Sequence, residues 1–274
     1  GRITGNFKTF AAHAQVSSDS LQVNHLDLRS CHLQLETDGL PDRPSGSLRA
    51  SATALDPPID LSAGFEWSGE TLSLSGVRAA LPGMNLDADL ELTPSSKEVS
   101  GTARGEIDSM ALLNAFSDLK AGGSGTFQLK IKRSSRPKDA TMEATFKDLR
   151  LGDYRASKLT IRGQADDLKT LSGRVTLEAS DGEVNDTRLQ TLTLAARGDL
   201  DKAVLNLKAA GSTRSIRNGR AVDIPVSLSG EVDMRHDDAW RFLLDHWKAL
   251  YGKLDVALAR PATIVLKDGQ LALD

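Results

Sequence analysis

Residues Leu177–Gly211 read LEASDGEVNDTRLQTLTLAARGDLDKAVLNLKAAG. Small aliphatic residues alternate here with polar ones, as in the consecutive residues Leu192, Thr193 and Leu194. Successive side chains of a β-strand point to opposite faces of the sheet, so a period of two predicts strands with one apolar and one polar face. Between its turn residues the stretch predicts three short strands, and it contains no aromatic residue.

The same alternation recurs through most of the 274-residue chain. Dipeptides typical of tight turns separate the alternating runs, at Ser68-Gly69, Pro82-Gly83, Asp181-Gly182, Asn218-Gly219 and Asp268-Gly269. Their spacing favours antiparallel meanders over parallel strands joined by helices. We therefore predict an all-β fold of about seventeen strands, each about 6 to 9 residues long.

The composition bears on how such a sheet is arranged. Only 39% of residues are hydrophobic and 4% aromatic, so the large rings that fill most β-sandwiches are scarce. An open sheet rarely exceeds roughly ten strands without curling or splitting into two. Two packed sheets would bury the apolar faces against each other, whereas one sheet curled lengthwise into a U would leave them facing a hydrophobic groove. The low aromatic content favours the U-shaped groove.

Charge and cysteine content narrow the choice of partners. The net charge of -3 argues against a nucleic-acid partner and a polybasic membrane patch. The single Cys31 cannot form an internal disulfide, which suits a reducing compartment or a periplasmic protein without disulfides. No run approaches the roughly 20 apolar residues needed to span a bilayer. The chain begins GRITGNF, without Met or a signal segment, so we expect a piece of a longer polypeptide.

Two segments depart from the alternating pattern and predict helices. In residues 108–120, Met110, Leu113, Phe116 and Leu119 recur at helical spacing after acidic and serine caps. In residues 237–251, Asp237 and Asp238 can cap a helix with an apolar stripe. That stripe contains Trp240, Leu243, Leu244, Trp247 and Tyr251. The second helix would dock on a sheet face or cap the groove with Trp240, Leu244 and Trp247; the alternative is a lipid gate or a membrane-surface contact, which its aspartates disfavour.

These elements predict a division of the chain along its length. Residues 1–107 and 121–236 would be β-rich segments of the groove, separated by the helix at 108–120. Residues 252–274 would be strands that follow the helix at 237–251 and continue into a missing C-terminal part.

Residue clusters with catalytic or metal-binding potential are weak. Cys31 and His32 are adjacent, so on a strand they point to opposite faces and make a poor chelate with His25. The MRHDDAW segment is typical of a solvated acidic cap, and GGSG at residues 122–125 precedes a strand, where no helix N-terminus can hold a phosphate. We predict no enzymatic activity, catalytic residue, metal or cofactor.

Three stretches resemble the recurring unit of the AsmA-like proteins, and most closely the TamB family. They are GEIDSMALLNAFSDLKAGGSGTFQLKIKR (residues 105–133), DLRLGDYRASKLTIRGQADDLKTLSGRVTLEA (residues 148–179) and ARPATIVLKDGQLALD (residues 259–274). The resemblance is clearest from Gly101 onward, and the residues before it match only in their general residue pattern. It is a pattern of degenerate repeats that carries no catalytic motif.

This resemblance implies a fold and a function. Members of the family resemble long curled β structures that cross the periplasm of Gram-negative bacteria with an apolar groove along their length. They are implicated in moving phospholipid to the outer membrane, and TamB in outer-membrane protein assembly with a barrel partner, TamA. The resemblance therefore implies a periplasmic segment of an inner-membrane-anchored parent, with phospholipid acyl chains as ligands and a TamA-like barrel as a partner of the parent.

The alternation supplies the candidate lining of such a groove, although it does not tell which face of each strand points inward. The candidates are Leu86, Leu90, Phe127, Leu129, Ile131, Leu159, Ile161, Val175, Leu177, Leu192, Leu194, Leu205 and Leu207. One alternative is a closed all-β binding or adhesion module with a dry interior and a protein or glycan partner on its loops. Another is a scaffold that pairs outer-membrane strands along its sheet edges.

Overall fold

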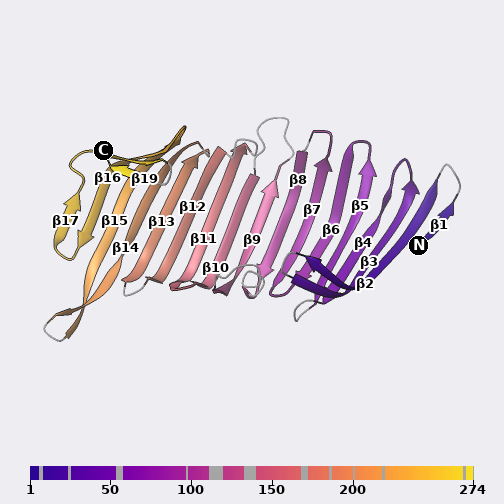
Figure 1. The fold of residues 1–274 in the computed structure, drawn as a ribbon, viewed down its shortest axis with the longest axis horizontal. Helices are drawn as coiled ribbons and strands as arrows, with labels where there is room; N and C mark the ends of the chain where they lie inside the picture. The colour runs from indigo at the N-terminus through magenta and orange to yellow at the C-terminus, as the bar shows by residue number, and fades with distance from the viewer. Residues whose placement is uncertain are drawn as a thin grey trace. The chain divides into compact units, whose positions relative to one another are not determined.

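The computed structural model describes residues 1–5, 9–23, 26–53, 58–96, 98–110, 120–132, 140–167, 172–184, 187–199, 201–217, 220–267 and 270–273. They belong to two compact units, Gly1–Arg133 and Ser134–Asp274. In each unit the strands follow one another in chain order and pair antiparallel (Figure 1). The predicted all-β class is thus confirmed, and the lengthwise curl into a U stays a prediction.

Among its described residues the first unit contains nine strands, each hydrogen-bonded to the next along the chain. They are β1 (Arg2–Gly5), β2 (Phe10–Val23), β3 (Leu26–Leu40), β4 (Ser45–Thr53), β5 (Ile59–Ser68), β6 (Thr71–Leu81), β7 (Met84–Thr93), β8 (Glu98–Ile107) and β9 (Ala121–Ile131). The predicted turns at Ser68-Gly69 and Pro82-Gly83 are confirmed, and Gly69 and Gly83 have φ of 60° and 77°.

The second unit contains ten strands among the described residues. They are β10 (Ala140–Leu151), β11 (Tyr154–Asp167), β12 (Ser172–Val184), β13 (Thr187–Gly198), β14 (Lys202–Arg217), β15 (Arg220–His236), β16 (Trp240–Tyr251), β17 (Leu254–Ala257), β18 (Ala262–Lys267) and β19 (Gln270–Leu273). Beyond β15, the strand β16 pairs with β17 along one half and with β18 along the other. Most strands are longer than predicted, up to 17 residues in β15.

The predicted turn at Asp181-Gly182 is wrong, because both residues lie inside β12. Asp181 has φ of 50°. It lies opposite Ser157 of β11 and Gln190 of β13, and the regular pairing of β12 with these two strands skips all three residues. Asp148, with φ of 50°, is skipped in the same way opposite Ser157. Four neighbouring strands thus share a row of skipped positions, which we call the row of bulges, and the pairing register itself shifts there between β13 and β14, at Leu189 and Thr191. Aspartate tolerates the left-handed conformation in bulges as in turns, so the local sequence signal is the same for both.

The predicted helix at 237–251 is wrong, because Trp240–Tyr251 forms the strand β16. A bulge at His246, with φ of 52°, interrupts its pairing with β15 between Ser229 and Glu231. The extra residue moves the alternation by one position, so that Trp240 and Trp247 fall on the same side of the strand. A helix would also place these positions on one side, which explains the false helical pattern.

The other predicted helix, at 108–120, lies largely outside the described residues, since 111–119 are not among them. Its described ends, residues 108–110 and 120, are not helical. In the described parts of the chain, no helix has the length and apolar character to cross a membrane. The predicted turns at Asn218-Gly219 and Asp268-Gly269 also lie outside the described residues.

The interior of this fold is thin. Of the nine buried hydrophobic side chains among the described residues, seven are alanines, and no side chain is completely buried. The accessible surface is 18686 Å², whereas two separate compact proteins of half the mass would together expose about 14,000 Å². The apolar side chains therefore lie along open sheets, without a second layer packed over them in the described residues.

Candidate functional site: an uncovered apolar sheet face

In the second unit the register brings the predicted lining residues together on one face of the sheet. One row consists of Ile161, Leu177, Leu194 and Leu207, which are direct cross-strand partners from β11 to β14. Leu159 and Leu192 belong to the next row, where each pairs with Ala179, and Val175 and Leu205 belong to a third, where each pairs with Ala196. We call this face of the second unit its apolar face.

The first unit has an apolar face of the same kind. Leu86 and Phe127 are both partners of Gly105, and Leu90 and Ile131 are both partners of Gly101. Leu129 pairs with Ala103 in the row between them. All thirteen candidates therefore lie on the apolar face of their own unit, and their role as the lining of a lipid groove stays a prediction.

The apolar face of the second unit contains a concavity of about 150 Å³ that spans the row of bulges. It is lined on one side of the bulges by Leu159, Leu177 and Leu192, and on the other by Leu149 and Tyr154. An apolar cavity of similar volume can hold a benzene-sized molecule. The bulges thus keep apolar residues on the same face beyond the point where strict alternation would turn them away. Leu149 and Tyr154 were missed because the sequence pattern does not reveal a bulge.

Two aromatic rings lie flat against the apolar faces. The ring of Phe127 occupies the space that a Cβ at Gly105 would need, and the indole of Trp247 occupies the corresponding space at Gly230. The indole Nε1 donates a hydrogen bond of 3.0 Å to the carbonyl oxygen of Glu231. Because each ring covers a glycine, it adds apolar area without rising above the sheet. Sequence reasoning missed the two glycines, because each lies on the strand next to that of its ring.

The structure places the predicted cap residues, Trp240, Leu244 and Trp247, in the sheet itself. In β16 they lie on the apolar face of the second unit, where Leu244 pairs with Val232 of β15 and Ala262 of β18. A capping helix at this position is therefore wrong. Four of the chain's twelve Phe, Tyr and Trp residues lie in β16, and the ring centroids of Trp240 and Phe242 are 6.3 Å apart.

The acidic segment before β16 is a turn. One carboxylate oxygen of Asp237 accepts hydrogen bonds from the backbone N–H groups of Asp238 and Ala239, and the other contacts Arg241. Hydrogen bonding with Asp238, and then with Arg241, holds the pKa of Asp237 below its ordinary value. Across the described ranges, no group of three or more His, Cys, Asp or Glu side chains could hold a metal ion.

The opposite face of the second unit is polar and carries ion pairs. Arg162 of β11 contacts Glu143 of β10 at 3.2 Å and Glu178 of β12 at 3.1 Å. These two carboxylates raise the pKa of the Arg162 guanidinium. All three side chains are at least half exposed, so water screens their attraction. The polarity of these three side chains favours contact of this face with water.

Because this triad is exposed, we predict that Arg162→Gln has only a small effect on stability. We expect the midpoint of thermal unfolding to stay close to that of the unchanged chain, because exposed ion pairs contribute little to stability. Thermal scans at low and high salt measure it. A large loss of stability, independent of salt, would contradict this assignment and indicate that the polar face is covered.

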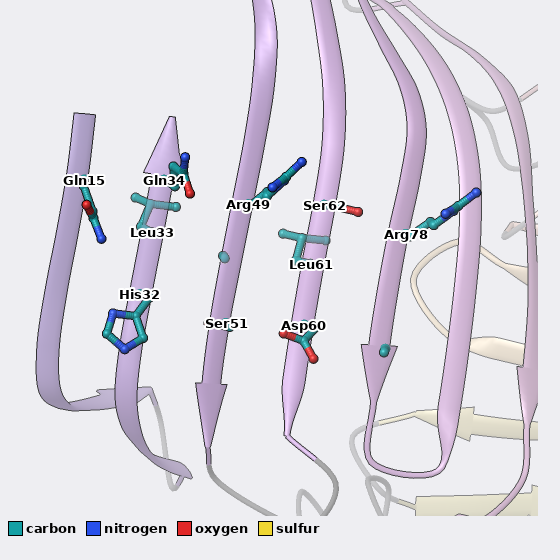
Figure 2. Close-up of a pocket in the computed structure, with 12 residues that line it drawn as sticks. Gln15, His32, Leu33, Gln34, Arg49, Ser51, Asp60, Leu61, Ser62 and Arg78 are labelled. Carbon is teal, nitrogen blue, oxygen red and sulfur yellow. The ribbon is translucent and has the colours of Figure 1, made fainter. Parts of the chain in front are cut away.

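A second hollow lies on the polar face of the first unit and was not predicted. This polar pocket has a volume of about 370 Å³ and crosses β2 to β6. Figure 2 shows Arg49 and Arg78 extending in the same direction from it, with Ser62 on the strand between them and His32 and Asp60 towards the other end. The register needed to find this cluster comes from five strands, so no local motif indicates it.

Antiparallel sheets with an uncovered apolar face and a charged opposite face define the class of this protein: an open amphipathic β-sheet protein that offers an extended apolar surface to water. The chain belongs to the TamB family, because the family model described as TamB, N-terminal domain, matches residues 72–264. This membership implies a protein of the Gram-negative cell envelope. No curated protein and no solved structure matches the chain.

Proposed function

We propose that this chain is a periplasmic segment of a TamB-like protein and binds phospholipid acyl chains along its apolar sheet faces. The observation that carries the proposal is the set of leucine rows on an uncovered face, such as Ile161, Leu177, Leu194 and Leu207. Val175 and Met142, on the same face, are 44% and 40% exposed. Apolar surface that is contiguous and open to water marks a binding surface.

The hydrophobic effect is sufficient for such binding. Each acyl methylene withdrawn from water contributes about 0.8 kcal/mol, so about ten methylenes against the sheet contribute about 8 kcal/mol before the entropy cost of binding. Rows of leucine, valine and alanine offer similar surroundings at successive positions. An acyl chain can therefore move from row to row while its head group stays in water, and movement needs no catalytic residue.

The proposed role in the cell follows from the family. The segment would be one part of a hydrophobic path for phospholipid between the inner and outer membranes, within a parent anchored in the inner membrane. Support for outer-membrane protein assembly would come through a TamA-like barrel that contacts the parent. Direction must come from the rest of the system, because binding alone shifts populations without driving net transport.

Lipid content of the purified chain tests the proposal. The chain is isolated without detergent and extracted with organic solvent, and phospholipid is quantified by mass spectrometry beside a β-sandwich of similar size prepared identically. We expect phospholipid well above that control. Background lipid on a particle that small-angle scattering shows to be compact would instead favour the closed binding module with a protein or glycan partner.

A further inference from the structure

The polar face of the first unit carries a ladder in which arginines occupy every second strand. Arg49, Ser62, Arg78, Asp87 and Arg104 are successive cross-strand partners on β4, β5, β6, β7 and β8. Neighbouring strands lie about 4.8 Å apart, so successive arginines are about 10 Å apart along the ladder. The residue between two arginines therefore decides what their guanidinium groups meet.

One of the two intervals contains an anion. The carboxylate of Asp87 stands between Arg78 and Arg104, at 3.7 Å from Nε of Arg78 and 3.6 Å from Nε of Arg104. One carboxylate thus serves two guanidinium groups. Their attraction is modest, because the two arginine side chains are 79% and 77% exposed.

The other interval contains a hydroxyl group in place of the carboxylate. Ser62 stands between Arg49 and Arg78, and Arg49 forms no ion pair with any residue that the structure describes. This interval opens into the polar pocket of about 370 Å³, where Figure 2 shows both arginine side chains extending in the same direction. The pocket thus has two cations and a hydroxyl donor, but no anion between them.

The other end of the polar pocket has a different charge. Asp60 lies two residues before Ser62 on β5, about 6.7 Å away on the same face, and His32 lies nearby. The Asp60 carboxylate repels a second negative group and attracts an amine. The pocket therefore suits a small phosphate ester that carries one phosphate and a neutral or cationic arm, and it disfavours extended polyanions.

We propose that the polar pocket binds a phosphate group between Arg49 and Arg78, with the Ser62 hydroxyl as a third hydrogen-bond donor. The two guanidinium groups are suited to phosphate because they offer paired N–H donors in a plane. The site lies on the face opposite the proposed acyl-chain surface, so it does not depend on lipid binding there. Its phosphate can belong to a lipid head group or to a small soluble molecule.

Two substitutions test the site in opposite ways. Arg49→Gln removes one cation, whereas Ser62→Asp supplies a carboxylate at the place that Asp87 fills in the next interval. Arg197→Gln, on the polar face of the second unit, changes the charge as Arg49→Gln does and serves as the matched control. Each purified chain is titrated with millimolar phosphoethanolamine and inorganic phosphate by NMR or calorimetry, and is floated with phosphatidylethanolamine–phosphatidylglycerol vesicles.

We expect binding of at least one probe, weakened about tenfold or more by Arg49→Gln and by Ser62→Asp but less than about twofold by Arg197→Gln. Flotation that depends on Arg49 identifies a lipid head group as the source, and binding of the soluble probes alone identifies a free phosphate compound. Ser62→Asp should keep or raise the thermal midpoint, so its loss of binding cannot come from unfolding. No binding, or binding that both pocket variants retain, overturns the proposal.

Discussion

Leu194→Asp should remove most of the phospholipid that co-purifies with the chain. Leu194 stands in the middle of a leucine row, between Leu177 and Leu207. A carboxylate there keeps its hydration shell and displaces acyl methylenes from the neighbouring positions. Loss of contact with about two methylenes, at about 0.8 kcal/mol each, lowers the occupancy roughly tenfold. Mass spectrometry of extracted lipid, normalised to protein, measures the change.

The adjacent residue provides the matched control. Thr193 lies on the polar face, where it pairs with Glu178 and Lys208. Thr193→Asp introduces the same charge one position away, and we expect its lipid content to equal that of the unchanged chain. Circular dichroism must show the same strand content in both variants. If the two aspartates reduce lipid equally, or if a folded Leu194→Asp chain keeps its lipid, the apolar face is not the binding surface.

Gly230→Ala should destabilise the second unit and move the Trp247 indole away from the sheet. The indole lies where the new Cβ would be placed, so the ring must rise and its hydrogen bond to the Glu231 carbonyl is lost. Forcing an extra carbon into a close contact costs about 1 to 3 kcal/mol. We expect a lower free energy of unfolding in denaturant titrations and a changed tryptophan fluorescence spectrum in the folded state.

A second glycine on the same face separates this effect from a general effect of alanine. At Gly163 an added Cβ meets only ordinary contacts, 3.8 Å from Met142 and 3.9 Å from Val175. Gly163→Ala should therefore leave the free energy of unfolding unchanged or raise it slightly, because alanine loses less backbone entropy than glycine. The cost of Gly230→Ala should also shrink when Trp247 is replaced by alanine. Equal costs in both backgrounds would show that the indole is not the cause.

The predicted lining residues show how far the sequence reaches. Leu192, Leu194, Leu205 and Leu207 could be assigned to common faces because alternation within a strand is a local property of the chain. When neighbouring strands share this period of two, their pairing lines up the apolar residues in rows. The all-β class and the amphipathic character of the sheets were predicted on this basis, and the family resemblance was confirmed by the match over residues 72–264.

The errors occur where a bulge interrupts the alternation. At His246 the extra residue gives β16 a spacing that also fits a helix, and at Asp181 a residue suited to a turn sits inside a strand. Whether such a residue bulges or turns depends on which partner strand is available for hydrogen bonding. That information is not contained in the segment itself.

By itself, the sequence of this protein determined which residues are apolar, their period of two, and therefore strands with one wet and one apolar face. Only the tertiary structure decided how the strands are aligned with one another. The alignment places Trp247 over Gly230, joins Leu149 to Leu159 across the row of bulges, and sets Ser62 between Arg49 and Arg78. These contacts join residues on different strands, and the register that creates them results from hydrogen bonding along whole ladders.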